Sequence, residues 1–200
     1  MPAKRLRIAT VMQFRLTYRG ELRSGNTKNR SHIHSVRTEF HRQLVRLWEQ
    51  PPLSEHTKWL RSASDAGPGN YFMLYDVGGR TFASVAGPGT ETLAELAILF
   101  LRPALPGALV RHGGDIDNRI KTLLDCLRIP SVDELPPDWQ TGRDEAPFHC
   151  LLQDDKLVTS FSVTSDRLLD YKDAEHEVLI VVHVKLTAVR VTMGNVGLIG

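Results

Sequence analysis

The sequence predicts an α/β or α+β fold, in which a mixed β-sheet is flanked by two main helices within a single domain of residues 1–200. Two segments repeat apolar residues at the three- and four-residue spacing of a helix, and several short runs are rich in β-branched and aromatic residues. The apolar fraction of 42% in 200 residues is enough to form a hydrophobic core.

The first strand is predicted over residues 11–18, where apolar and aromatic side chains are frequent. The first helix is predicted over residues 31–49, and Pro51 and Pro52 end it. Five apolar residues form one face of this helix: Ile33, Val36, Phe40, Leu44 and Leu47.

A β-hairpin is predicted over residues 71–86, because Gly78 and Gly79 can adopt the positive φ angles of a tight turn. Residues 93–101 are compatible with a helix or a strand, and we assign a strand because the run is short and ends at a proline. The second helix is predicted over residues 117–128, with Asp117 or Asn118 as its cap.

Residues 129–150 contain four prolines and no periodic pattern, so we interpret them as an insertion or a functional flap. Two late strands are predicted over residues 156–164 and 177–186, and the residues after 187 are interpreted as a tail.

Charge is unevenly distributed along the chain. Residues 1–46 carry eleven Lys and Arg against two Glu, a net charge of +9, whereas the remainder carries −7. A basic first quarter indicates either a polyanionic partner such as nucleic acid or a solvated basic surface. No apolar run reaches the length of about 18 residues that a membrane span needs. The N-terminus lacks the pattern of a signal peptide, and Cys126 and Cys150 form no C-x-x-C pair, so we expect a reducing cytoplasmic location.

The residues with the clearest chemical signal surround the start of the second helix. Asp115 and Asp117 are two residues apart, so their carboxylates project to the same side of an extended segment. Lys121 and Asp125 follow Asp117 at four-residue intervals and share one helix face with it, while the apolar stripe points elsewhere.

Asp154 and Asp155, just before a predicted strand, can add carboxylates from a separate segment. Clustered carboxylates repel one another unless protons or cations neutralise them, and oxygen ligands favour hard cations such as Mg²⁺ or Mn²⁺. A lysine beside them suits a phosphate. The combination indicates phosphodiester hydrolysis. The alternative is a capped helix with exposed acidic turns.

These residues form the pattern D-x-D-N-x-x-K-x-x-x-D-x-L from Asp115 to Leu127, followed by Asp154-Asp155. The pattern resembles that of the RusA family of Holliday junction resolvases. Two features depart from the family pattern. Only Arg111 and His112 stand where family members commonly carry several arginines, and residues 130–150 lengthen the segment before the second acidic pair.

The resemblance implies a homodimeric, Mg²⁺-dependent endonuclease that resolves four-way DNA junctions by paired nicks in recombination and repair. It implies that Asp115, Asp117 and Asp155 bind one or two metal ions and that cleavage requires Lys121. Asn118, Asp125 and Asp154 would have supporting roles; for Asp125 an alternative is a simple ion pair with Lys121.

Three arginines are candidate DNA contacts: Arg30, Arg37 and Arg111. Arg30 and Arg37 form a basic stripe on the first helix with His34 and His41, and a solvated helix face is the alternative interpretation. Two other functions remain open. The same site suits a nuclease for flaps, forks or duplex DNA, and the fold also suits a non-catalytic nucleic-acid-binding protein.

Overall fold

A computed structural model describes residues 9–23, 29–103, 116–140, 142, 146–172, 177–190 and 195. Its strands are β1 (Ala9–Glu21), β2 (Leu74–Val77), β3 (Arg80–Ala86), β4 (Thr92–Arg102), β5 (Phe148–Leu152), β6 (Val158–Arg167) and β7 (Glu177–Ala188). Its helices are α1 (Arg30–Trp48), α2 (Ala63–Ala66) and α3 (Ile116–Leu127), with short 3₁₀ segments η2 (Leu53–Trp59), η3 (Pro88–Thr90), η5 (Val132–Glu134) and η6 (Asp155–Leu157).

The strands form two sheets, both of mixed direction. The larger sheet has the order β1-β7-β4-β6; β7 is antiparallel to β1 and β4, and β6 is parallel to β4 at the edge. The smaller sheet has the order β2-β3-β5, with β5 parallel to β3. The predicted α+β class with a mixed sheet is confirmed, but the second sheet was not predicted.

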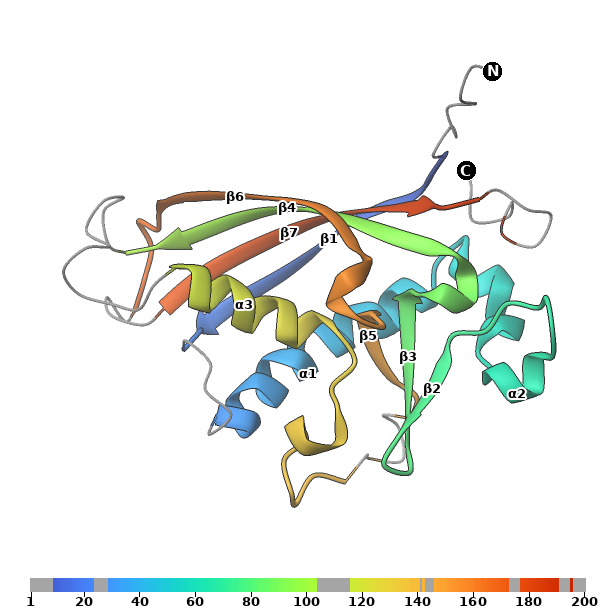
Figure 1. The fold of residues 1–200 in the computed structure, drawn as a ribbon. Helices are drawn as coiled ribbons and strands as arrows, with labels where there is room; N and C mark the ends of the chain where they lie inside the picture. The colour runs from blue at the N-terminus through green and yellow to red at the C-terminus, as the bar shows by residue number, and fades with distance from the viewer. Residues whose placement is uncertain are drawn as a thin grey trace.

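The two main helices lie against one face of the larger sheet (Figure 1). No helix or strand among the described residues covers its other face, and side chains of β1 alternate accordingly: Leu16 is buried, whereas Arg15 and Thr17 are exposed. The main core lies between the larger sheet, α1 and α3, with Phe40, Leu123 and Val182 essentially inaccessible to solvent.

Helix α1 is buried on two sides. Its predicted apolar face, including Val36 and Leu44, joins the main core. Its other side packs against β5, where the ring of His41 stacks on Phe148 with centroids 4.2 Å apart. The helix therefore joins the two sheets, beside a smaller core around Phe82 and Phe148.

Most predicted elements agree with the structure within a few residues. The exception is the segment 129–150, predicted to be irregular throughout: its last residues form β5, and Ser131 caps the short η5 segment. The predicted tail after residue 187 begins inside β7, which ends at Ala188, and Asn195 is buried with its side chain donating to the carbonyl of Arg190.

Candidate active site

Helix α3 has one buried apolar face and one exposed polar face, as the sequence predicts. Ile120 and Leu123 are buried in the main core, whereas Asp117 and Lys121, one turn apart, are exposed. Cys126, on the same helix, is also buried in the core, at 1% exposure. Burial raises the pKa of its thiol to about 12, so it is a packing residue and not a nucleophile.

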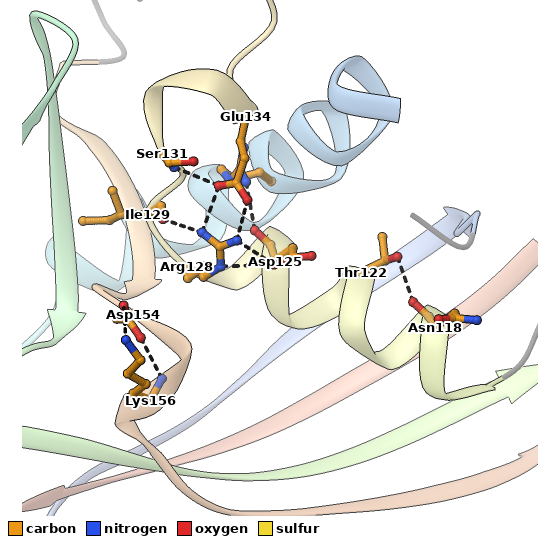
Figure 2. Close-up of polar contacts among 10 residues, drawn as sticks. Asn118, Thr122, Asp125, Arg128, Ile129, Ser131, Glu134, Asp154 and Lys156 are labelled. Atoms are coloured by element: carbon orange, nitrogen blue, oxygen red, sulfur yellow. Dashed lines mark hydrogen bonds and ion pairs between the residues drawn. The ribbon is translucent and has the colours of Figure 1, made fainter. Parts of the chain in front are cut away.

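The C-terminal end of α3 is held by an ion-pair cluster centred on Arg128. Its Nη2 lies 2.7 Å from Oδ1 of Asp125 and 2.6 Å from Oε1 of Glu134 (Figure 2). Burial disfavours the charged guanidinium, but Glu134 and Asp125 outweigh that cost and raise the pKa of Arg128. Burial likewise acts to raise the pKa of Glu134, yet hydrogen bonds from Arg128 and Ser131 lower it to about 2.

This cluster gives Asp125 a structural role. Its carboxylate accepts hydrogen bonds from Nε and Nη2 of Arg128, and its backbone carbonyl accepts one from buried Arg37. Asp125 was considered as an ion-pair partner of Lys121, but in the structure it pairs with Arg128. Arg128 also pairs with Glu134 and so connects α3 to the loop that follows it.

Asp154 and Asp155 follow β5, whose last residue, Leu152, forms a β-bridge with Arg128. The backbone N–H of Lys156 donates to Oδ1 of Asp154 over 3.0 Å, so Asp154 caps the η6 turn. That hydrogen bond is the main cause of a lowered pKa of Asp154, with smaller contributions from Asp155, Lys156 and Arg128. Asp155 is exposed.

The chain places Asp117 and Asp155 at opposite ends of α3. Asp117 is the second residue of the helix, whereas Asp155 comes three residues after Leu152, which is paired with Arg128 just beyond the other end. With a rise of 1.5 Å per residue, the helix separates positions 117 and 128 by about 16 Å. Figure 2 shows the same arrangement, with Asn118 at one end of α3 and Asp154 beyond the other.

The structure describes two of the three predicted metal ligands, Asp117 and Asp155, and places them towards opposite ends of α3. Carboxylate oxygens bind Mg²⁺ at about 2.1 Å, so two ligands of one ion lie within about 4 Å of each other. Among the described residues, no group of three or more His, Cys, Asp or Glu is placed to hold a metal. Asp115 lies outside the described residues, so the metal site predicted for Asp115, Asp117 and Asp155 stays a prediction.

A groove of about 330 Å³ runs beside the exposed face of α3, between this helix and edge strand β6. Asp117 and Lys121 stand on the helix side, and Phe161 and Val163 line the strand side. Phe161 is 56% exposed, although it is a large aromatic residue. The sequence analysis did not single out Phe161; the available signal was an aromatic residue within a mostly polar strand.

Of the three predicted DNA contacts, the one predicted for Arg37 is wrong. Arg37 is 1% exposed, and Nη2 donates to the carbonyl of Asp125 over 2.8 Å, so it cannot reach a phosphate on the surface. His34 and His41 are buried too, because β5 and Trp139 cover this side of α1. Arg30 is half-buried at the start of α1, and Arg111 lies outside the described residues.

No helix among the described residues is long and apolar enough to span a membrane. Comparisons with protein-family models, curated proteins and solved structures give no match to this chain.

Proposed function

We propose that the protein is a structure-selective DNA endonuclease, dependent on Mg²⁺ with Mn²⁺ as a substitute, that cuts four-way junctions. The observation that carries the proposal is the exposed face of α3, where Asp117 and Lys121 lie one turn apart beside a groove. Both belong to the D-x-D-N-x-x-K pattern that the chain has in common with RusA-type resolvases.

The chemistry of these two side chains suits a phosphodiester. The ammonium of Lys121 offers a point charge to a scissile phosphate. The carboxylate of Asp117, one turn earlier, can bind a cation or accept a proton from an attacking water. The dependence on Mg²⁺ is taken from the resemblance to RusA-type resolvases.

The polyanionic substrate is supported by the net charge of +9 in residues 1–46. A homodimer is proposed because a four-way junction has approximate two-fold symmetry and two sites can nick opposing strands. A cytoplasmic location is proposed because both cysteines are free thiols buried in the protein.

The test is cleavage of a labelled synthetic four-way junction in Mg²⁺, beside a linear duplex with the same arms. Wild type is compared with Asp117→Asn and with a matched control, Asp138→Asn, at an exposed aspartate in the loop after η5. Paired nicks in the junction by wild type and the control, but not by Asp117→Asn, support the proposal. Equal cutting of the duplex indicates a nuclease for other DNA structures. Binding without cleavage in Mg²⁺ and Mn²⁺ indicates a non-catalytic binding protein.

A further inference from the structure

Three side chains with buried donor atoms that lack a partner lie at the end of the larger sheet where β4 stops. Nε and Nη2 of Arg102, Nε of Arg119 and Oγ of Ser165 are buried and have no hydrogen-bond partner among the described residues. These side chains come from three elements, β4, α3 and β6. Buried polar groups in proteins are nearly always hydrogen-bonded, so this group of donors is suited to a bound acceptor.

The register of the sheet places Arg102 beside Ser165. Arg102 is the last residue of β4, and it is buried on the face that packs against the helices, as Ile98 and Phe100 are. Phe100 of β4 pairs with Ser165 of β6, and Arg102 pairs with Arg167. Paired residues of neighbouring strands point to the same face, so Ser165 and Arg167 lie on the same face as Arg102.

Helix α3 brings Arg119 to the same place. The N-terminal end of this helix lies against the sheet at the end where β4 stops (Figure 1). Burial lowers the pKa of Arg119, and the charge of Arg102 lowers it further, whereas the charge of Glu21 has the opposite effect. The effect of Arg102 indicates that the two guanidiniums lie close to each other. Glu21 itself pairs with Arg23.

The two arginines carry positive charge that no described carboxylate balances in an ion pair. Arg102 is 8% exposed and Arg119 is half-buried, and neither forms an ion pair within the part of the chain that the structure describes. An unpaired buried charge is costly, and two like charges close together add to that cost. A bound anion would remove both costs.

A phosphate group fits these donors better than a carboxylate does. A guanidinium donates parallel pairs of hydrogen bonds, and a phosphate can accept them from several directions on oxygens that are arranged tetrahedrally. The donors here come from two neighbouring strands and from a helix packed on them, not from a single plane. A phosphate monoester carries about −1.5 to −2 elementary charges near pH 7, which matches two guanidiniums.

These donors face away from the groove that holds Lys121. Arg119 is two residues from both Asp117 and Lys121, so its side chain leaves α3 in a direction about 200° away from theirs. Asp117 and Lys121 line the groove beside β6, whereas Arg119 does not. A phosphate at Arg102 and Arg119 is therefore not the scissile phosphate proposed at Lys121.

We propose that Arg102, Arg119 and Ser165 form a binding site for a phosphate group. In the proposed nuclease this group is a backbone phosphate of the bound strand, separate from the one that is cut. That assignment rests on the proposed function, whereas the binding of a phosphate group does not. Free phosphate or a small phosphorylated molecule offers the same chemistry, and experiment can separate these sources from DNA.

The first test measures the binding of inorganic phosphate. Sodium phosphate is titrated into the full chain at about pH 7.5 and constant ionic strength, and thermal unfolding is followed. A ligand that binds only the folded state raises the melting temperature, by about 3 °C at a concentration tenfold above Kd. We expect a saturable rise of this size in wild type. Arg102→Met and Arg119→Met should keep only the small, non-saturating rise that phosphate gives to proteins in general.

Arg46→Met, at an exposed arginine near the end of α1, is the matched control and should respond to phosphate as wild type does. Without phosphate, Arg102→Met should melt at the wild-type temperature or above it, because methionine removes an unpaired buried charge. If Arg102 serves only the fold, Arg102→Met melts lower by the same amount with and without phosphate, and the site is rejected. Arg119→Met, at the half-buried arginine, decides the question if Arg102→Met does not fold.

The second test asks whether the phosphate belongs to DNA. Binding of a labelled four-way junction is measured by fluorescence anisotropy in EDTA over a range of salt concentrations, so no cleavage is needed. Loss of one phosphate contact reduces the slope of log K against log salt concentration by about 1. Arg102→Met and Arg119→Met should each show this change and bind about tenfold more weakly. The double variant should also lose about 1, not about 2, because both arginines hold the same phosphate.

A saturable response to inorganic phosphate with unchanged DNA binding supports the site and assigns it to free phosphate or a small phosphorylated molecule. A reduced salt slope in the two arginine variants supports the site and assigns it to DNA. If wild type passes either test but has no nuclease activity, the site stands and the nuclease proposal fails. If both arginine variants match wild type in both tests, the site is rejected, whether or not wild type cleaves junctions.

Discussion

Nη2 of Arg128 lies 2.6 Å from Oε1 of Glu134, and this contact fixes the loop after α3 against the helix that carries Asp117 and Lys121. Because Ser131 donates its backbone N–H to the same glutamate over 2.8 Å, one carboxylate organises both the helix end and the next turn.

We expect Arg128→Leu to lower the free energy of unfolding by about 2 kcal/mol, because Asp125 and Glu134 lose their partner while remaining partly buried. Urea unfolding measures this change. Arg167→Leu, at an exposed arginine at the end of β6, should change it by less than about 0.5 kcal/mol. Equal effects of the two substitutions would show that the ion-pair cluster adds no stability.

The ion-pair cluster around Arg128 should also make the free energy of unfolding depend on pH in the acidic range. The pKa of Glu134 falls from 4.5 to about 2 on folding, so the folded state binds fewer protons than the unfolded state between these values. Its contribution is present above about pH 4.5 and is lost as the pH falls towards about 2. In Glu134→Gln, the dependence of the urea midpoint on pH in this window should be weaker than in wild type.

Two buried histidines should make the free energy of unfolding depend on pH in a higher range than Glu134 does. Burial lowers the pKa of His34 and of His149 from 6.5 to about 4, and each is 7% exposed. Below about pH 6.5 the unfolded state binds protons that the folded state excludes, so stability falls as the pH falls to about 4, by about 3 kcal/mol for each histidine.

His34→Phe tests this pH dependence. Neither ring nitrogen of His34 has a hydrogen-bond partner among the described residues, and the centroid of the ring lies 4.4 Å from that of Trp139. The variant should lose less stability than wild type between pH 7 and pH 5, measured by urea unfolding. At pH 8, where the histidine is neutral in both states, the two proteins should differ little. Parallel curves at all pH values would contradict the prediction.

Lys121→Met should lower the rate of junction cleavage by about a hundredfold or more, because a positive charge at the phosphate is lost. Its free energy of unfolding should stay near that of wild type, since Lys121 is exposed on α3. Lys58→Met, at an exposed lysine of η2, is the matched control and should cleave normally. An unchanged rate in Lys121→Met would remove this lysine from the proposed mechanism.

The hairpin between β2 and β3 offers a test of packing. Gly78 and Gly79 both have positive φ, at 60° and 76°. A Cβ at Gly78 would lie 3.3 Å from the side chain of Val132, whereas a Cβ at Gly79 meets nothing within 4 Å. Gly79→Ala should cost about 1 kcal/mol through backbone strain, and Gly78→Ala should cost more. The reverse order in thermal or urea unfolding would contradict the structure.

Local sequence patterns predicted a helix or strand well where its structure does not depend on contacts with distant segments. The apolar spacing in α1 and the prolines after it predicted a helix over 31–49, and the structure has Arg30–Trp48. Strand β5 was missed because its five residues are all buried and pair in parallel with the distant β3, so no alternation marks it.

The candidate site was predictable only in part for the same reason. The exposure of Asp117 and Lys121 follows from the period of α3 alone. The burial of Arg37 and the distance between Asp117 and Asp155 depend on where β5 returns to the fold, and nothing in the local sequence fixes that position.

The packing of α1 on both sides has a consequence for how the molecule opens. Its apolar face belongs to the larger core, and its histidines belong to the aromatic cluster beside the smaller sheet. Neither sheet can move away from the rest of the molecule without exposing a buried side of α1. The backbone amides of α1 should therefore exchange with deuterium only when the whole chain unfolds, and amides of β3 and β7 should show the same opening free energy.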